Sequence, residues 1–283
     1  MSILEAIILA IVEGLTEFLP ISSTGHMIIT QALMGMESTE YVKSFTVMIQ
    51  LGAILSVVVL YFKRFINFSL PSDMWHGNIP EWRRFLARFR FYFKLIVGLI
   101  PAVIFGLIFN NWIDEVLGSV WVIAVNLIIG GIVMLFVDSI IRNNERSEVT
   151  YPNAIIIGFF QCLAILLPGM SRSMCTIVGG MTQGLTRKTA AEFSFFLAVP
   201  TMFGAALLKA YKMWESGGKQ IFVDNLNTLI IGNVVSFIVG LLAIKFFISY
   251  LGKHGFRAFG IYRILVGGTI ITMILLGVDL AVI

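Results

Sequence analysis

Residues 13–26 read EGLTEFLPISSTGH and lie inside an otherwise apolar N-terminal segment. The spacing of Glu13 and Glu17 places two carboxylates on one face of a helix. Pro20 then interrupts that helix, and a run of small hydroxyl residues follows it. In a soluble loop this polar break would be ordinary, so its meaning depends on the rest of the chain.

The composition is that of a membrane protein. Of the 283 residues, 58% are hydrophobic and 13% are charged, and the mean hydropathy is +0.93. Soluble domains carry about a quarter charged residues. The formal net charge of +4 is concentrated in loops, which points to membrane orientation and not to nucleic acid. Cys162 and Cys175 lack CxxC spacing, so neither a cysteine metal site nor a disulfide framework is indicated.

The apolar runs predict a single polytopic membrane domain, 1–283. Each run is close to the roughly 20 residues that a spanning helix needs. The continuous runs lie near 42–62, 92–110, 120–141, 191–211, 228–250 and 261–282. Two broken segments, at about 3–35 and 153–185, each consist of two short halves joined by Pro and small polar residues. We expect these to be re-entrant helical hairpins, because irregular backbone at membrane depth must be buried in protein or line a wet cavity.

The chain also repeats itself. Residues 13–20, EGLTEFLP, align with residues 161–168, QCLAILLP, at an offset of 148 that carries Ser23 onto Ser171. The order of the later elements agrees, which predicts two repeats, 1–142 and 150–283, each with one hairpin and three spans. Because three is odd, the second copy is expected upside down in the membrane. The predicted fold class is an all-α polytopic membrane protein with two inverted-topology repeats.

Basic residues predict the orientation. One connection is crowded with Lys63, Arg64, Arg83, Arg84, Arg88, Arg90 and Lys94. The positive-inside rule makes this connection cytoplasmic, so both termini and the mouth of the first hairpin should face the periplasm. Arg263, inside the last run, is expected to snorkel to the inner interface.

Ionisable residues within membrane segments are candidate functional residues, because an unpaired charge there is costly. Glu13, Glu17, His26 and Arg172 meet this criterion. The second break, PGMSRSMCT at 168–176, combines small hydroxyls, the start of a helix and a guanidinium that suits phosphate oxygens. The alternatives are simple capping by the serines and a purely structural Glu–Arg pair.

The two motifs together resemble the undecaprenyl pyrophosphate phosphatase family of bacterial inner membranes, which is the bacitracin-resistance type. That family shows a Glu-xxx-Glu pair leading into SS[ST]GH and a later PGxSRSGxT motif. The likeness covers essentially the whole chain, including the stretches QLG at 50–52 and EFSF at 192–195. Met174 departs from it, since the family pattern has Gly at that position.

The resemblance implies hydrolysis of undecaprenyl pyrophosphate to undecaprenyl phosphate and inorganic phosphate, which recycles the lipid carrier of cell-wall synthesis, with Mg²⁺ or Ca²⁺ assisting. The expected partners are a polyprenyl diphosphate lipid and the bilayer, with a homodimer as a further option and no nucleic acid. The expected catalytic residues are Glu17, Ser23, His26 and Arg172, the substrate-binding residues are Ser22, Thr24, Gly25, Ser171, Ser173 and Thr176, and the metal-binding residues are Glu13 and Glu17.

Two questions stay open at the level of sequence. Ser23 is the favoured nucleophile, with His26 about one helical turn further as its base, but His26 itself or an activated water are alternatives. A transporter or lipid flippase is the second functional class, because inverted repeats with broken helices are typical of transporters. The clustered Glu, Ser and His opposite an Arg favour phosphoryl transfer. A structural scaffold would leave the intramembrane charges unexplained.

Overall fold

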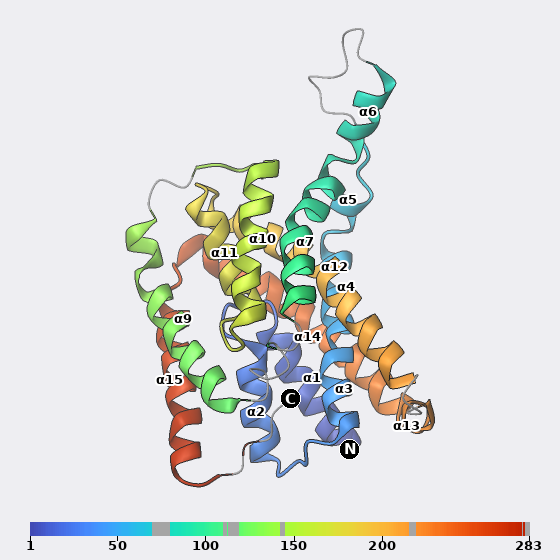
Figure 1. The fold of residues 1–283 in the computed structure, drawn as a ribbon, viewed down its shortest axis with the longest axis vertical. Helices are drawn as coiled ribbons and strands as arrows, with labels where there is room; N and C mark the ends of the chain where they lie inside the picture. Colours follow the sequence, from blue (N-terminus) through green and yellow to red (C-terminus); the bar gives the residue numbers. More distant parts are fainter. Residues whose placement is uncertain are drawn as a thin grey trace.

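The computed structural model describes residues 1–69, 80–109, 112, 119–141, 145–214, 219–278 and 280. These residues form helices and no strand (Figure 1). The helices are α1 (Ile3–Thr16), α2 (Ser23–Leu33), α3 (Glu40–Met48), α4 (Gln50–Leu60), α5 (Phe62–Phe65), α6 (Glu81–Arg88), α7 (Arg90–Ile108), α9 (Val120–Ile140), α10 (Tyr151–Leu166), α11 (Arg172–Thr182), α12 (Arg187–Met213), α13 (Lys219–Asp224), α14 (Leu226–Lys253) and α15 (Arg257–Leu275).

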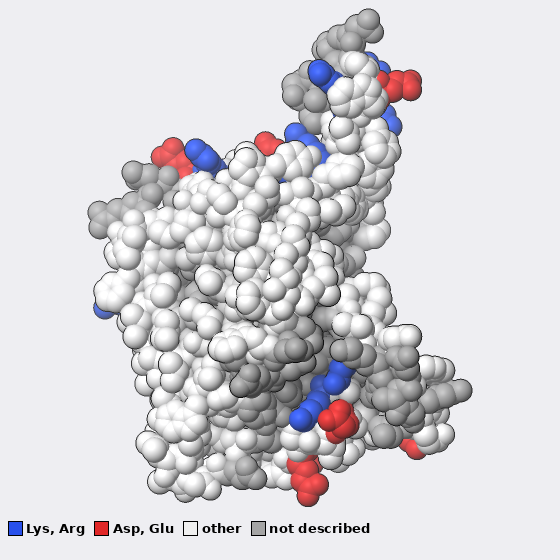
Figure 2. All heavy atoms as spheres, in the orientation of Figure 1, with Lys and Arg blue, Asp and Glu red and all other residues white. Residues whose placement is uncertain are grey.

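The all-α membrane class is confirmed. Within the described residues, six helical stretches are long and apolar enough to cross a membrane: Glu40–Leu60, Arg90–Ile108, Val120–Ile140, Arg187–Tyr211, Leu226–Lys253 and Arg257–Leu275. Each overlaps one of the predicted apolar runs. Figure 2 shows most charged side chains of one face near the two ends of the molecule, with a broad white zone between them. The chain is therefore a multi-pass membrane protein.

Two pairs of short helices interrupt this pattern where the sequence predicts breaks. The pair α1 and α2 has 14 and 11 residues, and the pair α10 and α11 has 16 and 11. At 1.5 Å per residue the longest of these is about 24 Å, which is less than the roughly 30 Å hydrocarbon core. Figure 1 shows α1 and α2 in the lower half of the molecule and α10 and α11 in the upper half, with both connecting loops near mid-height.

Local chemistry explains where these pairs begin and break. A capping box starts α1, where Glu5 N donates to Ser2 Oγ and Ser2 N donates to the Glu5 carboxylate. The loop between α10 and α11 begins at Leu167, whose φ of −125° and ψ of 83° are not helical. Leu167 precedes Pro168, and proline disfavours helical backbone in the residue before it.

The two halves of the chain pack against each other through close helix crossings. Helix α1 lies against α14, α10 against α7, and α9 against α15. Gly158 of α10 is in backbone contact with Gly98 of α7, and a Cβ added to Gly158 would also lie 3.1 Å from Pro101. Gly52 approaches the backbone of Asn233, whose Oδ1 accepts from Gly52 N at 2.8 Å. Small residues permit such close approach between membrane helices.

Candidate active site

The loop after α1 touches the first turn of α11 directly. Ser173 Oγ donates a hydrogen bond to the backbone oxygen of Leu19 at 2.8 Å. Arg172 reaches across the same junction to Glu17. The two sequence motifs, about 150 residues apart, are thus brought into one place.

Both loops end on a serine with left-handed backbone. Ser22 has φ 70° and ψ 101° at the start of α2, and Ser171 has φ 71° and ψ 117° at the start of α11. Positive φ is uncommon in residues other than glycine, and such strain concentrates at functional sites. The turns aim the N-termini of two helices at one region, and helix N-termini attract anions through free N–H groups and the helix dipole.

Glu17 lies at the centre of the site. Its Oε2 accepts a hydrogen bond of 2.7 Å from Ser23 Oγ, while its Oε1 lies 3.2 Å from Nη2 of Arg172. The Arg172 Nη1 donates to the backbone oxygen of Ser194 at 3.2 Å. The side chains of Arg172 and Glu17 are only 15% and 8% exposed, so water screens their ion pair weakly. One carboxylate therefore contacts both a hydroxyl and a guanidinium.

These groups line a cavity of about 210 Å³. Its walls come from both loops and from α4, α10 and α12. The lining residues that the sequence predicts as site residues are Glu17, Ser22, Ser23, Thr24, Ser171 and Arg172. Sequence reasoning missed three further polar lining residues, Gln50, Gln161 and Thr201. Gln50 begins the QLG stretch of the family resemblance, and Gln161 begins the stretch that aligns with residues 13–20. Both are polar residues within apolar runs, and this polarity could have indicated a role in the site.

Three other predicted site residues are buried beside the cavity and do not line it. Thr176 is fully buried, and its Oγ1 lies 2.6 Å from Ser194 Oγ. Ser173 is also fully buried and bonds to the opposite loop, as described above. Gly25 packs on Leu127, whose Cδ1 would lie 2.6 Å from an added Cβ. Their contacts fix α2 and α11 against neighbouring elements.

His26 has partners of its own. Its Nδ1 lies 2.7 Å from the backbone oxygen of Ser22, and its Nε2 lies 2.8 Å from the Tyr262 hydroxyl, with the two rings stacked at 5.5 Å. A carbonyl only accepts, so Nδ1 donates; in the neutral ring Nε2 then accepts from Tyr262. The Ser23 hydroxyl is bonded to Glu17 instead. The role of His26 as the base for Ser23 stays a prediction.

Glu13 lies one helical turn before Glu17 and is 1% exposed. Its Oε1 has no hydrogen-bond partner among the described residues. No three His, Cys, Asp or Glu side chains gather anywhere in the described part of the chain, so the two glutamates would be the protein's contribution to a cation site. Mg²⁺ commonly takes one or two carboxylates and completes its shell with water and substrate phosphate. The unpartnered oxygen of Glu13 fits that arrangement.

Arg263 corrects one prediction. It is fully buried and does not snorkel to an interface. Its guanidinium donates to the backbone oxygens of Pro20 at 3.2 Å and Gly169 at 2.9 Å, one in each loop. It also donates to two α9 carbonyls, those of Asn126 and Leu127. The non-helical loops leave carbonyls without helical partners at membrane depth, and Arg263 satisfies them.

An apolar groove of about 590 Å³ borders the first loop. Leu19 and Ile21 of that loop form one wall, and α14 and α15 form the others. Tyr262, the partner of His26, also lines the groove. The groove therefore begins beside the polar loop and continues over an apolar surface.

Comparison with known proteins places the chain in a family. The family model described as Bacitracin resistance protein BacA matches residues 6–269. The chain belongs to this family. A protein of Porphyromonas gingivalis named undecaprenyl-diphosphatase is 62% identical over 283 residues, which is 100% of both chains. Relatives of the same name from Flavobacterium psychrophilum and Aquifex aeolicus are 52% identical over 270 residues (94% of each chain) and 43% identical over 268 residues (93% of this chain, 95% of the relative). Membership of the BacA family confirms the resemblance drawn from the two motifs.

Proposed function

We propose that this protein is an undecaprenyl-diphosphatase, which hydrolyses undecaprenyl pyrophosphate to undecaprenyl phosphate and inorganic phosphate and so recycles the lipid carrier of cell-wall synthesis. The observation that carries the proposal is the contact of Ser23 and Arg172 with the single carboxylate of Glu17. Relatives that bear this name match the chain over its full length. Nothing in those names favours the transporter alternative.

The substrate has a charged end and an apolar end, and the site offers a surface for each. Arg172 and the N-termini of α2 and α11 would bind the diphosphate through charge-assisted hydrogen bonds. The apolar groove beside Leu19 and Ile21 suits the isoprenoid tail. Because the groove borders the same loop as the polar cavity, one lipid would occupy both.

The hydrogen bonds support a mechanism with Ser23 as nucleophile. Ser23 Oγ attacks the terminal phosphorus, its proton passes to Glu17, and the bond from that phosphorus to the bridging oxygen breaks to release undecaprenyl phosphate. Arg172 offsets the charge that develops on the transferred phosphoryl group. A water then attacks the phosphorus of the phosphoserine, the bond from Ser23 Oγ to phosphorus breaks, Glu17 returns its proton to Ser23 Oγ, and inorganic phosphate leaves. His26 as nucleophile, or a direct attack by water, are the competing routes.

A divalent cation, Mg²⁺ or Ca²⁺, belongs to the proposal. Glu13 and Glu17 would hold it, and the unpartnered Oε1 of Glu13 supports that placement. When bound, the ion would neutralise phosphate charge and polarise a phosphoryl oxygen. Glu13 also sets the local charge, since two carboxylates one turn apart repel each other unless a cation or a proton lies between them.

The architecture that we propose is a pair of inverted repeats, 1–142 and 150–283, each with a re-entrant hairpin. The packing of α1 on α14 has its counterpart in the packing of α10 on α7, as expected if the halves exchange roles. The matching φ angles of Ser22 and Ser171 support the repeat, with one additional residue in the second loop relative to the offset of 148. The proposal also sets the protein in the bacterial inner membrane with the catalytic cavity toward the periplasm, and the excess of basic residues in one connection supports it.

Phosphate release from undecaprenyl pyrophosphate in detergent tests the function, because a detergent solution has no second compartment for transport. We expect chelator-sensitive release by the parent protein. Ser23→Ala and Arg172→Gln should lower kcat by about 10³-fold and 10²-fold respectively. Thr269→Ala, which alters an exposed hydroxyl on α15, is the control and should keep the parent rate.

Two outcomes would contradict parts of the proposal. If the parent binds the lipid without releasing phosphate, the activity is wrong and transport becomes the better explanation. If Ser23→Ala turns over near the parent rate while Glu17→Gln does not, the serine mechanism is wrong and a water or His26 attacks.

A further inference from the structure

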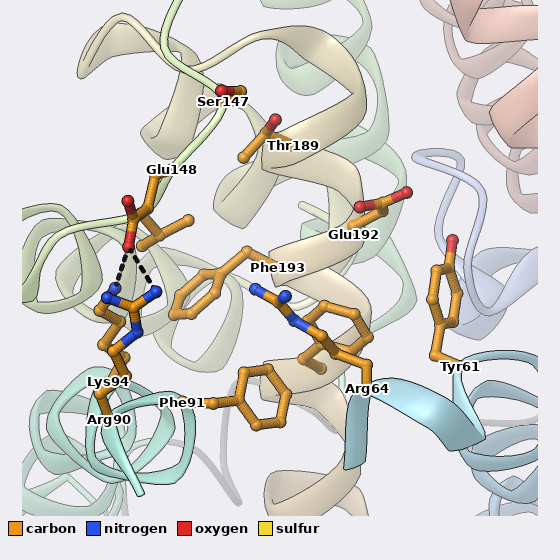
Figure 3. A pocket seen from close by; sticks show the side chains of 12 residues that line it. Tyr61, Arg64, Arg90, Phe91, Lys94, Ser147, Glu148, Thr189, Glu192 and Phe193 are labelled. Atoms are coloured by element: carbon orange, nitrogen blue, oxygen red, sulfur yellow. Dashed lines mark hydrogen bonds and ion pairs between the residues drawn. The ribbon is translucent and has the colours of Figure 1, made fainter. Parts of the chain in front are cut away.

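A second polar cavity, of about 360 Å³, lies away from the catalytic site (Figure 3). We call it the basic cavity. It is enclosed by the end of α4, by α5, by the first turns of α7 and α12, and by the segment before α10. Its lining includes the side chains of Tyr61, Arg64, Arg90, Phe91, Lys94, Ser147, Glu148, Thr189, Glu192 and Phe196.

One wall of the basic cavity pairs two cations with one carboxylate. Glu148 Oε1 lies 3.2 Å from Nζ of Lys94 and 3.7 Å from Nη2 of Arg90. The hydrogen bond from Lys94, together with the charges of Lys94 and Arg90, holds the pKa of Glu148 below its ordinary value, so this carboxylate is ionised at neutral pH. A single carboxylate thus serves two cations.

The opposite wall carries a cation without such a partner. Arg64 lies with its guanidinium 5.5 Å from the centre of the Phe91 ring. Among the described residues, no carboxylate oxygen comes within 4.0 Å of it. Figure 3 shows Arg64 reaching toward the middle of the cavity, across from Glu148 and its two cations. A guanidinium held by a cation–π contact still has N–H donors for an oxygen ligand.

The cavity as a whole has an excess of positive charge. Three cations (Arg64, Arg90 and Lys94) face two carboxylates (Glu148 and Glu192). Ser147 and Thr189 add hydroxyl groups to the lining. One positive charge remains to be balanced, and the available donors suit a tetrahedral oxyanion.

Aromatic rings close the cavity on one side. Phe196 packs edge-to-face on Tyr61, Phe65 and Phe91, with ring centres 5.1 Å, 5.7 Å and 5.2 Å away. Next along α4 and α12, the buried residues Ile54, Ala198 and Met202 pack together. Met202 also lines the catalytic cavity and Phe196 lines the basic cavity, so these apolar residues of α12 lie between the two polar cavities.

The position of the basic cavity matches the headgroup layer of a bilayer. Three spanning stretches end or begin there, at Leu60, Arg90 and Arg187. Figure 2 shows that Lys and Arg side chains gather near this end of the molecule. Basic pockets between membrane helices at this level bind lipid phosphates.

We propose that the basic cavity binds a phosphate monoanion, the group that a phospholipid headgroup and inorganic phosphate share, with Arg64 as its direct donor. The site is separate from the catalytic cavity and does not rest on the proposed hydrolysis. Arg90 and Lys94 hold the opposite wall in place through Glu148 and add to the positive potential.

Two phosphate probes test the proposal on purified, delipidated protein. Inorganic phosphate is titrated while the thermal midpoint is followed, and dioleoylphosphatidylglycerol binding is measured by native mass spectrometry, with dioleoylglycerol as the phosphate-free control. Arg64→Gln should weaken binding of the phosphate probe about tenfold, and Arg64→Lys should weaken it less, because the charge remains but the planar fork is lost. Arg83→Gln is the matched control, since Arg83 is exposed, stacks on Trp82 and lies outside the cavity.

The catalytic cavity is the same in all these variants, so the difference between Arg64→Gln and Arg83→Gln isolates the basic cavity. Loss with both probes supports a phosphate site open to either source, and loss with the lipid alone assigns a headgroup site. Binding that is equal in Arg64→Gln and Arg83→Gln, or binding of neither probe, overturns the proposal. Hydrolysis by Arg64→Gln within about twofold of the parent shows that the variant is folded. If Arg64→Gln loses hydrolysis, Arg64→Lys becomes the test variant. Phosphate binding by Arg64→Lys equal to that by Arg83→Gln then overturns the proposal.

Discussion

At the scale of single residues, Arg263 shows how an intramembrane charge can serve structure without a carboxylate. Its four hydrogen bonds end on backbone oxygens, two in the loops beside the candidate site and two in α9. A buried unpaired charge is costly, so the stabilisation of those carbonyls must offset the loss of hydration. The guanidinium suits this role because it presents five donors in one plane.

Replacing Arg263 should therefore destabilise the protein through the loops. Arg263→Gln leaves the carbonyls of Pro20 and Gly169 without donors, and we expect a loss of about 3 kcal/mol or more in unfolding free energy. Arg263→Lys should recover only part of it, because one ammonium cannot reach both loops. Thermal unfolding in detergent measures the change, with Arg257→Gln at the exposed start of α15 as control. Equal midpoints for Arg263→Gln and Arg257→Gln would show that the loops do not depend on this cation.

The sequence predicted the residues that belong to motifs, and it missed those whose role depends on distant contacts. Glu17, Ser23 and Arg172 were predicted from local pattern, and all three line the cavity. Arg263 was placed at an interface, because a hydropathy pattern reports depth but not the carbonyls that surround a side chain. Nothing in the sequence indicated that Tyr262 contacts the site, because its partner His26 is 236 residues away along the chain.

At the scale of elements, glycines set the distances between helices. A Cβ on Gly158 would overlap the backbone of Gly98. Gly158→Val should thus force α10 away from α7 and cost about 1–3 kcal/mol, the usual penalty of overpacking. Gly106→Val is the matched control on α7, because nothing lies within 4 Å of a Cβ there. The thermal unfolding midpoints of the two variants test this prediction. Equal midpoints would show that α10 and α7 can move apart without loss of stability.

The sequence predicted the helices and their breaks better than it predicted single contacts. All six spans follow from the length of the apolar runs, and both breaks follow from Pro20 and Pro168, since bilayer thickness and proline geometry act locally. The turn geometry was not foreseen. The repeat alignment paired Ser23 with Ser171, whereas the residues with matching left-handed backbone are Ser22 and Ser171. The alignment was anchored on Pro20 and Pro168, so it could not reveal that the second loop has one more residue after its proline than the first.

At the scale of the whole molecule, the two halves of the chain pack against each other through several helix pairs. Helix α1 packs on α14 and α10 packs on α7, so each pair of short helices packs against a helix of the other half. The cross-half ion pair of Arg187 with Asp138, at 2.7 Å, and the bond from Phe256 N to the same carboxylate add polar links.

A chain cut between Ile141 and Glu145 should consequently behave as two dependent fragments. Expressed alone, either fragment should be degraded or aggregate, because its packing faces stay unpaired; expressed together, the fragments should assemble and recover hydrolysis. Co-purification through a tag on one fragment, with phosphate release as readout, measures this. A stable single fragment with native-like protease resistance would contradict the interlocked arrangement.

The apolar wall of Ile54, Ala198 and Met202 has a consequence for the cell that carries the protein. Two water-accessible pockets stacked along the same helices would form a conduit for ions if nothing interrupted them. A tightly packed hydrocarbon barrier excludes water, so this wall opposes the passage of protons and cations between the two cavities. We therefore expect this wall to help the enzyme keep charged groups inside the bilayer without opening a path along which the membrane potential would discharge.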